Sequence, residues 1–248
     1  MSCVPLIEFP DALLRRDYHG FWDDFTCTRD AAEWAVVAAA AGTPTGVVGD
    51  AAGGIMTLAT GAATDNHGGF LERPVEEFKA AADKPLVFEA RVQYTEAATD
   101  DANVFVGLID AVAATSLADD GAGIAATGAF GFYKLDSLPA GSTTLWRAYV
   151  ECNNVVLADV ILNATNALDK TAHVAGTASA YQVLRIEVIP ITATYGDVRF
   201  FIDGVLVYKY SGDILTSATE LQVAFGLKNG GATQETLKID YATCWQKR

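Results

Sequence analysis

The sequence of 248 residues is poor in the side chains that most often carry chemistry. Its three histidines, His19, His67 and His173, are far apart and never occur in His-x-x-x-His spacing. Zinc hydrolases and hydrolases with a Ser-His-Asp triad need histidine in such patterns, and the Gly-x-Ser-x-Gly motif is absent too. A glycine-rich phosphate loop ending in Gly-Lys-Ser/Thr is also missing. We therefore predict no metal, no cofactor, no catalytic residues and no enzymatic activity.

Cysteine is also scarce. Cys3, Cys27, Cys152 and Cys244 are scattered without Cys-x-x-Cys spacing, so neither a zinc site nor a redox pair is indicated. The favoured interpretation is reduced thiols, because disulfides are rare in the cytoplasm, where we expect the chain to be made. A disulfide between Cys27 and Cys244 is the alternative.

Basic residues are also few, and long apolar runs are absent. Seventeen Lys and Arg stand against 31 Asp and Glu, which gives a formal net charge of −14. Nucleic acids and anionic membranes would meet a repulsive field, so neither is an expected partner. No apolar run approaches the roughly 18 residues of a membrane-spanning helix. The first ten residues lack the basic and apolar regions of a signal peptide, so none is expected.

What the sequence does contain is the alternation of apolar and polar residues that is typical of antiparallel strands. Hydrophobic residues make up 51% of the chain, and residues 86–94 alternate most regularly. In residues 29–41 the alanines favour a helix, whereas Trp34 and the two valines that follow favour a strand, which we prefer. Many strands without alternating helices predict an all-β sandwich of two antiparallel sheets. The predicted strands lie near 54–60, 86–94, 104–110, 129–135, 145–151, 155–162, 181–189, 221–227 and 237–245.

Residues 199–210 predict a β-hairpin, because Asp203-Gly204 joins two β-forming runs and suits a type I′ turn. A two-residue loop pairs Ile202 with Val205, Phe201 with Leu206, Phe200 with Val207 and Arg199 with Tyr208. Both faces of this hairpin are then largely apolar. We therefore expect it to lie in the interior of the domain.

The N-terminal segment differs from the rest. Residues 1–20 show no clean period, so we interpret them as an N-terminal arm, and residues 21–248 as a single jelly-roll β-sandwich domain. The arm is either a disordered terminus or a segment that docks on a neighbouring subunit, and its apolar residues favour docking. The candidate partner-binding residues of the arm are Leu6, Ile7, Phe9, Leu13, Leu14, Arg15 and Arg16.

The order of motifs resembles the concanavalin-A-like (LamG-like) jelly roll, especially in structural proteins of tailed bacteriophages. The resemblance covers about residues 21–245. It implies two curved antiparallel sheets, neighbouring termini and a place in the virion. The motifs are Phe21-Trp-Asp-Asp-Phe25, Gly53-Gly-Ile-Met-Thr-Leu-Ala-Thr60, Thr64-Asp-Asn66, Lys84-Pro-Leu-Val-Phe-Glu-Ala-Arg91, Asn103-Val-Phe-Val-Gly-Leu-Ile-Asp110, Phe130-Gly-Phe-Tyr133, Leu184-Arg-Ile-Glu-Val188, Phe200-Phe-Ile-Asp-Gly204 and Ile239-Asp-Tyr241.

On this resemblance the leading hypothesis is a capsid decoration (cement) protein, made in the host cytoplasm, that binds the outer surface of a phage head. The arm would contact the major capsid protein, and self-association into a homo-oligomer is expected, a trimer being the form that fits three-fold capsid positions. The alternative is a lectin-like carbohydrate-binding module, or a tail-spike component, that recognises host glycans through its loops.

Concanavalin-A-like folds also include endoglycanases, whose carboxylates follow a Glu-x-Asp-x-x-Glu pattern that this sequence lacks. Glu187 and Asp240 are single outward acids, interpreted as solvated strand residues. His67 is the best ligand candidate, although a plain loop residue is favoured. The acidic segments 100–103 and 119–121 offer oxygens for calcium but form no complete motif, so polar turns are favoured. Trp146 and Tyr149 fall on opposite strand faces, which leaves one of them available for the surface.

Overall fold

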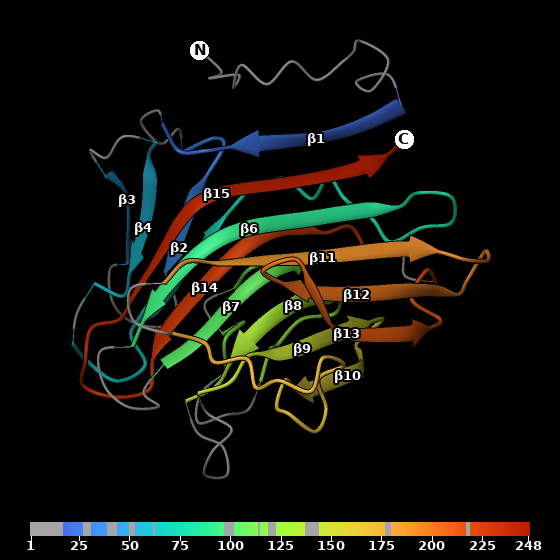
Figure 1. Cartoon of the computed structure of the whole chain (residues 1–248). Coiled ribbons are helices and arrows are strands. Elements are labelled where there is room, and N and C mark those ends of the chain that lie inside the picture. Colours follow the sequence, from blue (N-terminus) through green and yellow to red (C-terminus); the bar gives the residue numbers. More distant parts are fainter. Residues whose placement is uncertain are drawn as a thin grey trace.

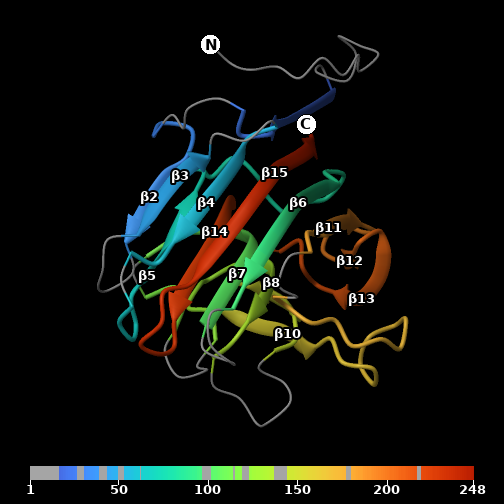
Figure 2. The same cartoon turned by 60° about the vertical axis from the view of Figure 1, so that its left-hand side comes forward.

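The computed structural model describes residues 17–26, 31–38, 44–49, 53–61, 63–96, 102–113, 115–118, 123–136, 144–176, 180–216 and 219–248. In these ranges the regular elements are fifteen β-strands arranged in two sheets. Figures 1 and 2 show the sheets as two layers facing each other. No helix in the described residues is long and apolar enough to cross a membrane. The all-β sandwich of two antiparallel sheets that the sequence predicted is confirmed.

The larger sheet has eight strands: β1 (Tyr18–Asp23), β3 (Thr45–Gly49), β4 (Ile55–Ala59), β6 (Leu86–Thr95), β11 (Gln182–Pro190), β12 (Gly196–Ile202), β13 (Val205–Gly212) and β15 (Thr236–Lys247). Their order is β13-β12-β11-β6-β15-β4-β3, and β1 pairs with the C-terminal half of the long strand β15. In Figure 1 the strands β1, β15, β6, β11, β12 and β13 follow one another down the picture. All these pairings are antiparallel.

The smaller sheet has seven strands: β2 (Ala35–Ala38), β5 (Gly68–Glu72), β7 (Ala102–Ile109), β8 (Ala129–Lys134), β9 (Arg147–Cys152), β10 (Val155–Ile161) and β14 (Gln222–Asn229). Their order is β10-β9-β8-β7-β14-β5-β2. Each strand predicted from the sequence is present. The segment around Trp34 is also a strand, β2, in residues 35–38, so the preferred strand interpretation is confirmed over the helix.

The core lies between the two sheets and is built by the alternation that the sequence showed. In β6, Phe88 and its inward neighbours are buried, whereas Glu89 and Arg91 point outward. Rings from the two sheets meet: Phe88 lies 6.4 Å from Phe225 of β14, and Phe200 of β12 packs edge-on against Phe132 of β8 at 5.3 Å. Each buried phenylalanine contributes about 1.5–3 kcal/mol to folding, so these contacts hold the two sheets together.

The described ends of the chain lie side by side. β1 pairs with β15 over its whole length, and the Arg248 amide donates a hydrogen bond to the Asp17 carbonyl over 2.8 Å. The neighbouring termini that the resemblance implied are therefore observed for the described residues (Figure 1). Residues 18–20, which the sequence analysis placed in the arm, form the start of β1. Residues 1–16, with all seven candidate partner-binding residues, lie outside the described ranges.

The hairpin β12–β13 differs from its prediction in register and in position. Asp203 and Gly204 both have positive φ, as a type I′ turn requires, and the first two predicted pairs form. Val207 is then an extra residue in a β-bulge, so Phe200 faces Tyr208 and Arg199 faces Lys209. The hairpin is not interior, because β13 is an edge strand and Val205 is exposed. The bulge places Lys209 beside Arg199 on the outer face of the sheet.

The cysteines in the described part of the chain are free thiols. Cys152 and Cys244 are both buried. Burial raises the pKa of the Cys152 thiol to about 12 and that of Cys244 well above its usual range, so both are protonated at neutral pH. Cys244, the suggested disulfide partner of Cys27, is therefore a reduced core residue. Cys3 and Cys27 lie outside the described ranges.

Candidate functional site

The outer face of the eight-stranded sheet, which is turned away from the core, carries a group of partly exposed aromatic rings. Trp22 of β1 and Tyr241 of β15 stack with their ring centroids 4.8 Å apart and their planes 15° from parallel. Trp245 points outward on the same strand as Tyr241, and all three side chains are half-buried. We call Trp22, Tyr241 and Trp245 the aromatic platform. Each keeps part of its ring open to solvent.

Two local features hold the aromatic platform in place. Gly20 of β1 lies under the ring of Trp245, and a Cβ atom there would be only 2.1 Å from the Cys244 carbonyl oxygen and 2.9 Å from the ring. Only glycine permits this approach. The Tyr241 hydroxyl donates a hydrogen bond to Glu89 of β6 over 2.8 Å. Burial, together with the hydrogen bond to this carboxylate and its charge, raises the pKa of Tyr241, so the hydroxyl remains a donor at neutral pH.

Ion pairs continue the same face beyond the platform. Arg91 lies opposite Tyr241 in the strand pairing, forms a 2.5 Å ion pair with Asp240 and covers the ring of Tyr181 at 4.4 Å. On β11, Arg185 pairs with Glu187. Arg185 also lies 5.4 Å from the ring centre of Phe201 on β12. The face therefore combines flat apolar rings with fixed charged groups.

Asp197 of β12 is the acidic residue of this face that lies nearest the β13 edge of the sheet. Its carboxylate accepts a hydrogen bond from the Ser211 hydroxyl over 2.7 Å and lies 3.0 Å from the Lys209 ammonium and 3.3 Å from the Arg199 guanidinium. Burial alone would raise the pKa of Asp197, but these hydrogen bonds outweigh it and hold the pKa below its ordinary value. Asp197 is therefore ionised at neutral pH.

The outer face of the seven-stranded sheet is instead partly covered by a loop. A second apolar cluster lies there, in which Leu117 and Ile124 pack against Phe70, Phe105 and further strand residues. A Cβ at Gly226 would lie 2.8 Å from Leu117, which shows how closely this loop covers β14. Two carboxyl groups with raised pKa, Glu72 and Glu151, lie on this sheet. Burial is the main cause of both shifts.

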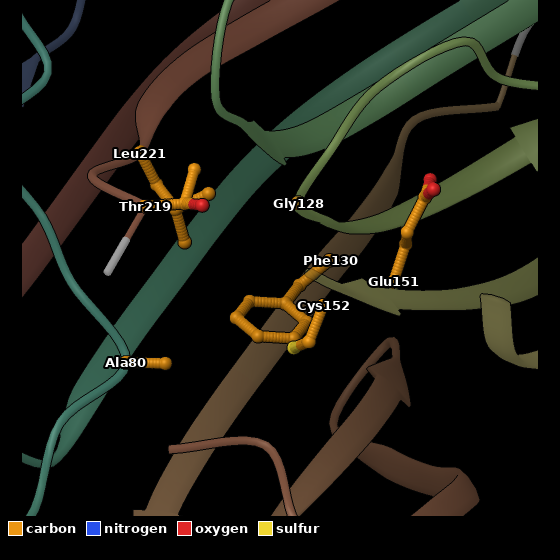
Figure 3. Close-up of a pocket in the computed structure, with 7 residues that line it drawn as sticks. All are labelled: Ala80, Gly128, Phe130, Glu151, Cys152, Thr219 and Leu221. Atoms are coloured by element: carbon orange, nitrogen blue, oxygen red, sulfur yellow. The ribbon is translucent and has the colours of Figure 1, made fainter. Parts of the chain in front are cut away.

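A small pocket opens at one end of the seven-stranded sheet (Figure 3). It is lined by Ala80, Gly128, Phe130, Glu151, Cys152, Thr219 and Leu221. In Figure 3 the carboxylate of Glu151 points away from Phe130 and Cys152. The Glu151 carboxylate accepts a 2.7 Å hydrogen bond from the hydroxyl of Tyr149. The pocket is thus lined mainly by apolar groups, together with the protonated Cys152 thiol, the Thr219 side chain and Glu151.

The carboxylates and histidines considered from the sequence do not meet in one place. Glu187 and Asp240 are outward residues, as predicted, and each is engaged by an arginine. His19 lies 2.8 Å from the Glu77 carbonyl, and His173 lies 3.1 Å from Asp169. His67 is a half-buried loop residue. The described ranges contain no group of three or more His, Cys, Asp or Glu residues that could hold a metal ion.

Other candidates were placed wrongly or lie outside the described residues. Trp146 and Tyr149 do fall on opposite strand faces, yet both are buried, because the loop carrying Ile124 covers Tyr149. Asn103 is buried and accepts a hydrogen bond from the Asp136 amide, so it is not a free calcium ligand. The acidic residues at 100–101 and 119–120 lie outside the described ranges.

The aromatic platform was missed by the sequence analysis because its members come from opposite ends of the chain. Trp22 and Thr243 are paired across β1 and β15, although more than 200 residues separate them. Regular alternation in residues 237–245 places Tyr241 and Trp245 on the same side as Leu237 and Ile239, so it predicts inward rings. The β-bulge between Ile239 and Tyr241 turns both of them outward. Nothing in the sequence pattern showed that β1 would bring a further ring beside them.

The whole chain resembles known proteins in its fold but not in its sequence. No protein family model matches the sequence, and no curated protein matches it. Among solved structures the chain is similar to the endo-1,3-β-glucanase from Streptomyces sioyaensis, with a TM-score of 0.61 and 14% identity over 93% of this chain and 96% of that one. Peanut lectin with a bound 9mer peptide matches with a TM-score of 0.56 and 11% identity, over 93% and 97%.

The carbohydrate recognition domain of Emp46p in its potassium-bound form is also similar, with a TM-score of 0.55 and 10% identity over 90% of this chain and 94% of that domain. The chain has the concanavalin-A-like jelly-roll fold. At these identities the likeness shows the fold alone. The similar structures include both lectins and a glucanase, so the fold by itself assigns neither role.

Proposed function

We propose that this protein is a non-enzymatic carbohydrate-binding module that holds a glycan on the outer face of its eight-stranded sheet. The aromatic platform is the observation that carries the proposal. Sugar rings present apolar C–H groups that pack on flat aromatic faces, while their hydroxyls bond to nearby charged groups. Trp22 and Tyr241 supply the rings, which are stacked on each other and partly exposed, and Glu89 and Arg91 lie next to them. The similarity to lectins and glucanases supports the same class of ligand.

Binding is favoured over hydrolysis because the carboxylates on this face are already engaged. A glycosidase needs one protonated carboxyl as an acid and a second carboxylate as a base or nucleophile. Here Tyr241 donates to Glu89, Arg185 pairs with Glu187, and Arg91 pairs with Asp240. Prolonged incubation with a β-1,3-glucan should release no reducing ends. Release that one carboxylate substitution abolishes would show a glucanase instead.

The binding test uses the purified protein and a panel of soluble polysaccharides in affinity electrophoresis. Trp22→Ala should weaken binding by about tenfold or more, which is the loss expected for a central aromatic contact. Tyr195→Ala is the matched control, because Tyr195 is an exposed aromatic residue away from the platform. Unchanged binding by the Trp22 variant, or equal weakening by the control, would contradict this location for the site.

Decoration of a phage capsid is the second proposal, and its support is the resemblance in the sequence together with the apolar residues 6–14. The virion location and the contact with a major capsid protein belong to this proposal. Co-sedimentation with empty capsids tests it directly. The full-length protein should sediment with them, and a variant without residues 1–16 should not. Retained sedimentation by the truncated protein would remove the role of the arm.

A further inference from the structure

The basic groups beside the aromatic platform lie in one row across the sheet. Arg91, Arg185, Arg199 and Lys209 come from four successive strands, β6, β11, β12 and β13. In the strand pairing, Arg185 lies opposite Glu89, which is two residues from Arg91. Arg199 likewise lies opposite Glu187, which is two residues from Arg185. Lys209 pairs directly with Arg199. Diagonal neighbours in a sheet lie about 7–8 Å apart and directly opposite residues about 4.5–5.5 Å apart, so the four cations form a continuous row.

The aromatic platform lies next to the Arg91 end of this row. In the strand pairing Tyr241 lies opposite Arg91, and Trp22 lies opposite Thr243, which in turn lies opposite Glu89. Trp22 is therefore level with Arg185, and the six residues form a bent path over six strands, from β1 to β13. We call its members, Trp22, Tyr241, Arg91, Arg185, Arg199 and Lys209, the diagonal track. Figure 1 shows the six strands as neighbours in this order.

The basic groups of the track reach solvent more than the acids that neutralise them. The side chains of Arg91, Arg185, Arg199 and Lys209 are 37–42% exposed, whereas those of their acidic partners are 4–25% exposed. A ligand that approaches this face meets guanidinium and ammonium groups first. The rings of Tyr181 and Phe201 support two of the guanidinium groups from below.

Arg185 combines a buried and an exposed part. Its Nη2 atom bonds to Glu187 and its Nε atom is buried, whereas the side chain as a whole is 42% exposed, so a ligand reaches the guanidinium but not Nε. Carboxylates and sulfates suit the fork-shaped geometry of a guanidinium.

Building on the proposed function, we propose that the diagonal track binds a linear acidic polysaccharide, whose carboxylate or sulfate groups contact Arg185 and its neighbouring cations while its sugar rings pack on Trp22 and Tyr241. A repeating anion matches a repeating row of cations. The net negative charge of the chain opposes nucleic acid and acidic polysaccharide alike, so the local row of cations has to outweigh it. The polysaccharide is preferred because its sugar rings can pack on Trp22 and Tyr241.

The test titrates the purified protein with polygalacturonate, heparin, the neutral glucan laminarin and a short DNA duplex. We expect polygalacturonate or heparin to bind at least about tenfold more tightly than laminarin, with affinity that falls as salt rises from about 50 to about 300 mM. Whichever of the two binds identifies a carboxylate or a sulfate as the preferred anion. Arg185→Gln should weaken this binding by about tenfold.

Removal of an acid gives the sharper result. Glu187→Gln removes the negative charge beside Arg185 and should strengthen binding of the acidic polysaccharide severalfold. If the ion pair were only structural, its loss would not strengthen binding. Lys170→Gln is the charge control, because Lys170 is an exposed lysine outside the track and should leave affinity unchanged. Thermal unfolding confirms that each variant is folded.

The outcomes separate this inference from the proposed function. Equal affinity for laminarin and the acidic polysaccharides would overturn the track and keep glycan binding. DNA binding as tight as polysaccharide binding, or weaker binding by Glu187→Gln, would also overturn the track. Failure to bind any polysaccharide, neutral or acidic, would overturn both.

Discussion

Replacement of Asp197 by asparagine tests how the buried end of the ion-pair network supports β12 and β13. The variant keeps the shape of the side chain and removes its negative charge. The Asp197 carboxylate makes three polar contacts: with the Ser211 hydroxyl at 2.7 Å, with Lys209 at 3.0 Å and with Arg199 at 3.3 Å. The amide nitrogen of asparagine cannot accept hydrogen bonds, so at least one of these contacts is lost.

The size of the effect follows from burial. Asp197 is 3% exposed, and a hydrogen bond to a charged group contributes about 1.5–3 kcal/mol. Lys209 and Arg199 are about 40% exposed, so both can turn to solvent and regain hydration, which limits the loss. We expect Asp197→Asn to lower the free energy of unfolding by about 2 kcal/mol, which is about 4–8 °C in Tm for a chain of this size.

The pH dependence provides an internal check. The pKa of Asp197 is lower in the folded state than in the unfolded chain, so its stabilising effect is complete above the unfolded pKa of about 3.9 and disappears as the pH falls through the folded value. Urea unfolding at a series of pH values from about 7 down to about 2.5 should therefore show a constant difference between the variant and the wild type above about pH 5. The difference should shrink below about pH 4.

Asp213→Asn is the control, because Asp213 is exposed after the end of the same hairpin and should change stability by less than about 0.5 kcal/mol. Equal stability of Asp197→Asn and wild type at pH 7 would refute the reasoning. A difference that persists at the lowest pH would refute it as well, because the charge would then not be its cause.

Three further outcomes follow from the structure. Phe200→Ala removes a ring packed edge-on against Phe132 and should lower the free energy of unfolding by about 3–5 kcal/mol in urea titrations, while a loss below about 1 kcal/mol would contradict its place in the core. Gly20→Ala puts a Cβ against the Cys244 carbonyl and should displace β1, detected as faster hydrogen exchange of the β1 amides; unchanged exchange would contradict the close approach. Tyr241→Phe removes the hydrogen bond to Glu89 and should lower stability by about 1 kcal/mol with glycan binding retained, whereas loss of binding would show that the hydroxyl, rather than the ring, contacts the sugar.

The fold could be predicted from the sequence because its strands are regular. Residues 86–94 and 181–189 alternate between core and solvent, and they occupy the middle of the eight-stranded sheet as β6 and β11. The Asp203-Gly204 turn could also be predicted, because a type I′ turn needs positive φ at both central residues and Asp-Gly tolerates it.

The details that position the site could not be predicted in the same way. A β-bulge adds one residue at Val207, and no local signal in the hairpin sequence distinguishes it from a regular pair. The bulge puts Lys209 rather than Tyr208 opposite Arg199, so the charged row depends on it. The pairing of β1 with β15 depends on contacts across the whole chain, which alternation within one strand does not encode.

The central claim is that a glycan binds on the outer face of the eight-stranded sheet, and the tryptophan indole signals of isotope-labelled protein test it most directly. Trp22 and Trp245 lie half-buried on this face, whereas Trp34 and Trp146 are buried and donate hydrogen bonds to Asp23 and Gln182. Titration with a polysaccharide that binds the protein should shift the indole signals of Trp22 and Trp245 and leave those of Trp34 and Trp146 unchanged. Binding without any shift at Trp22 and Trp245 would contradict the claim.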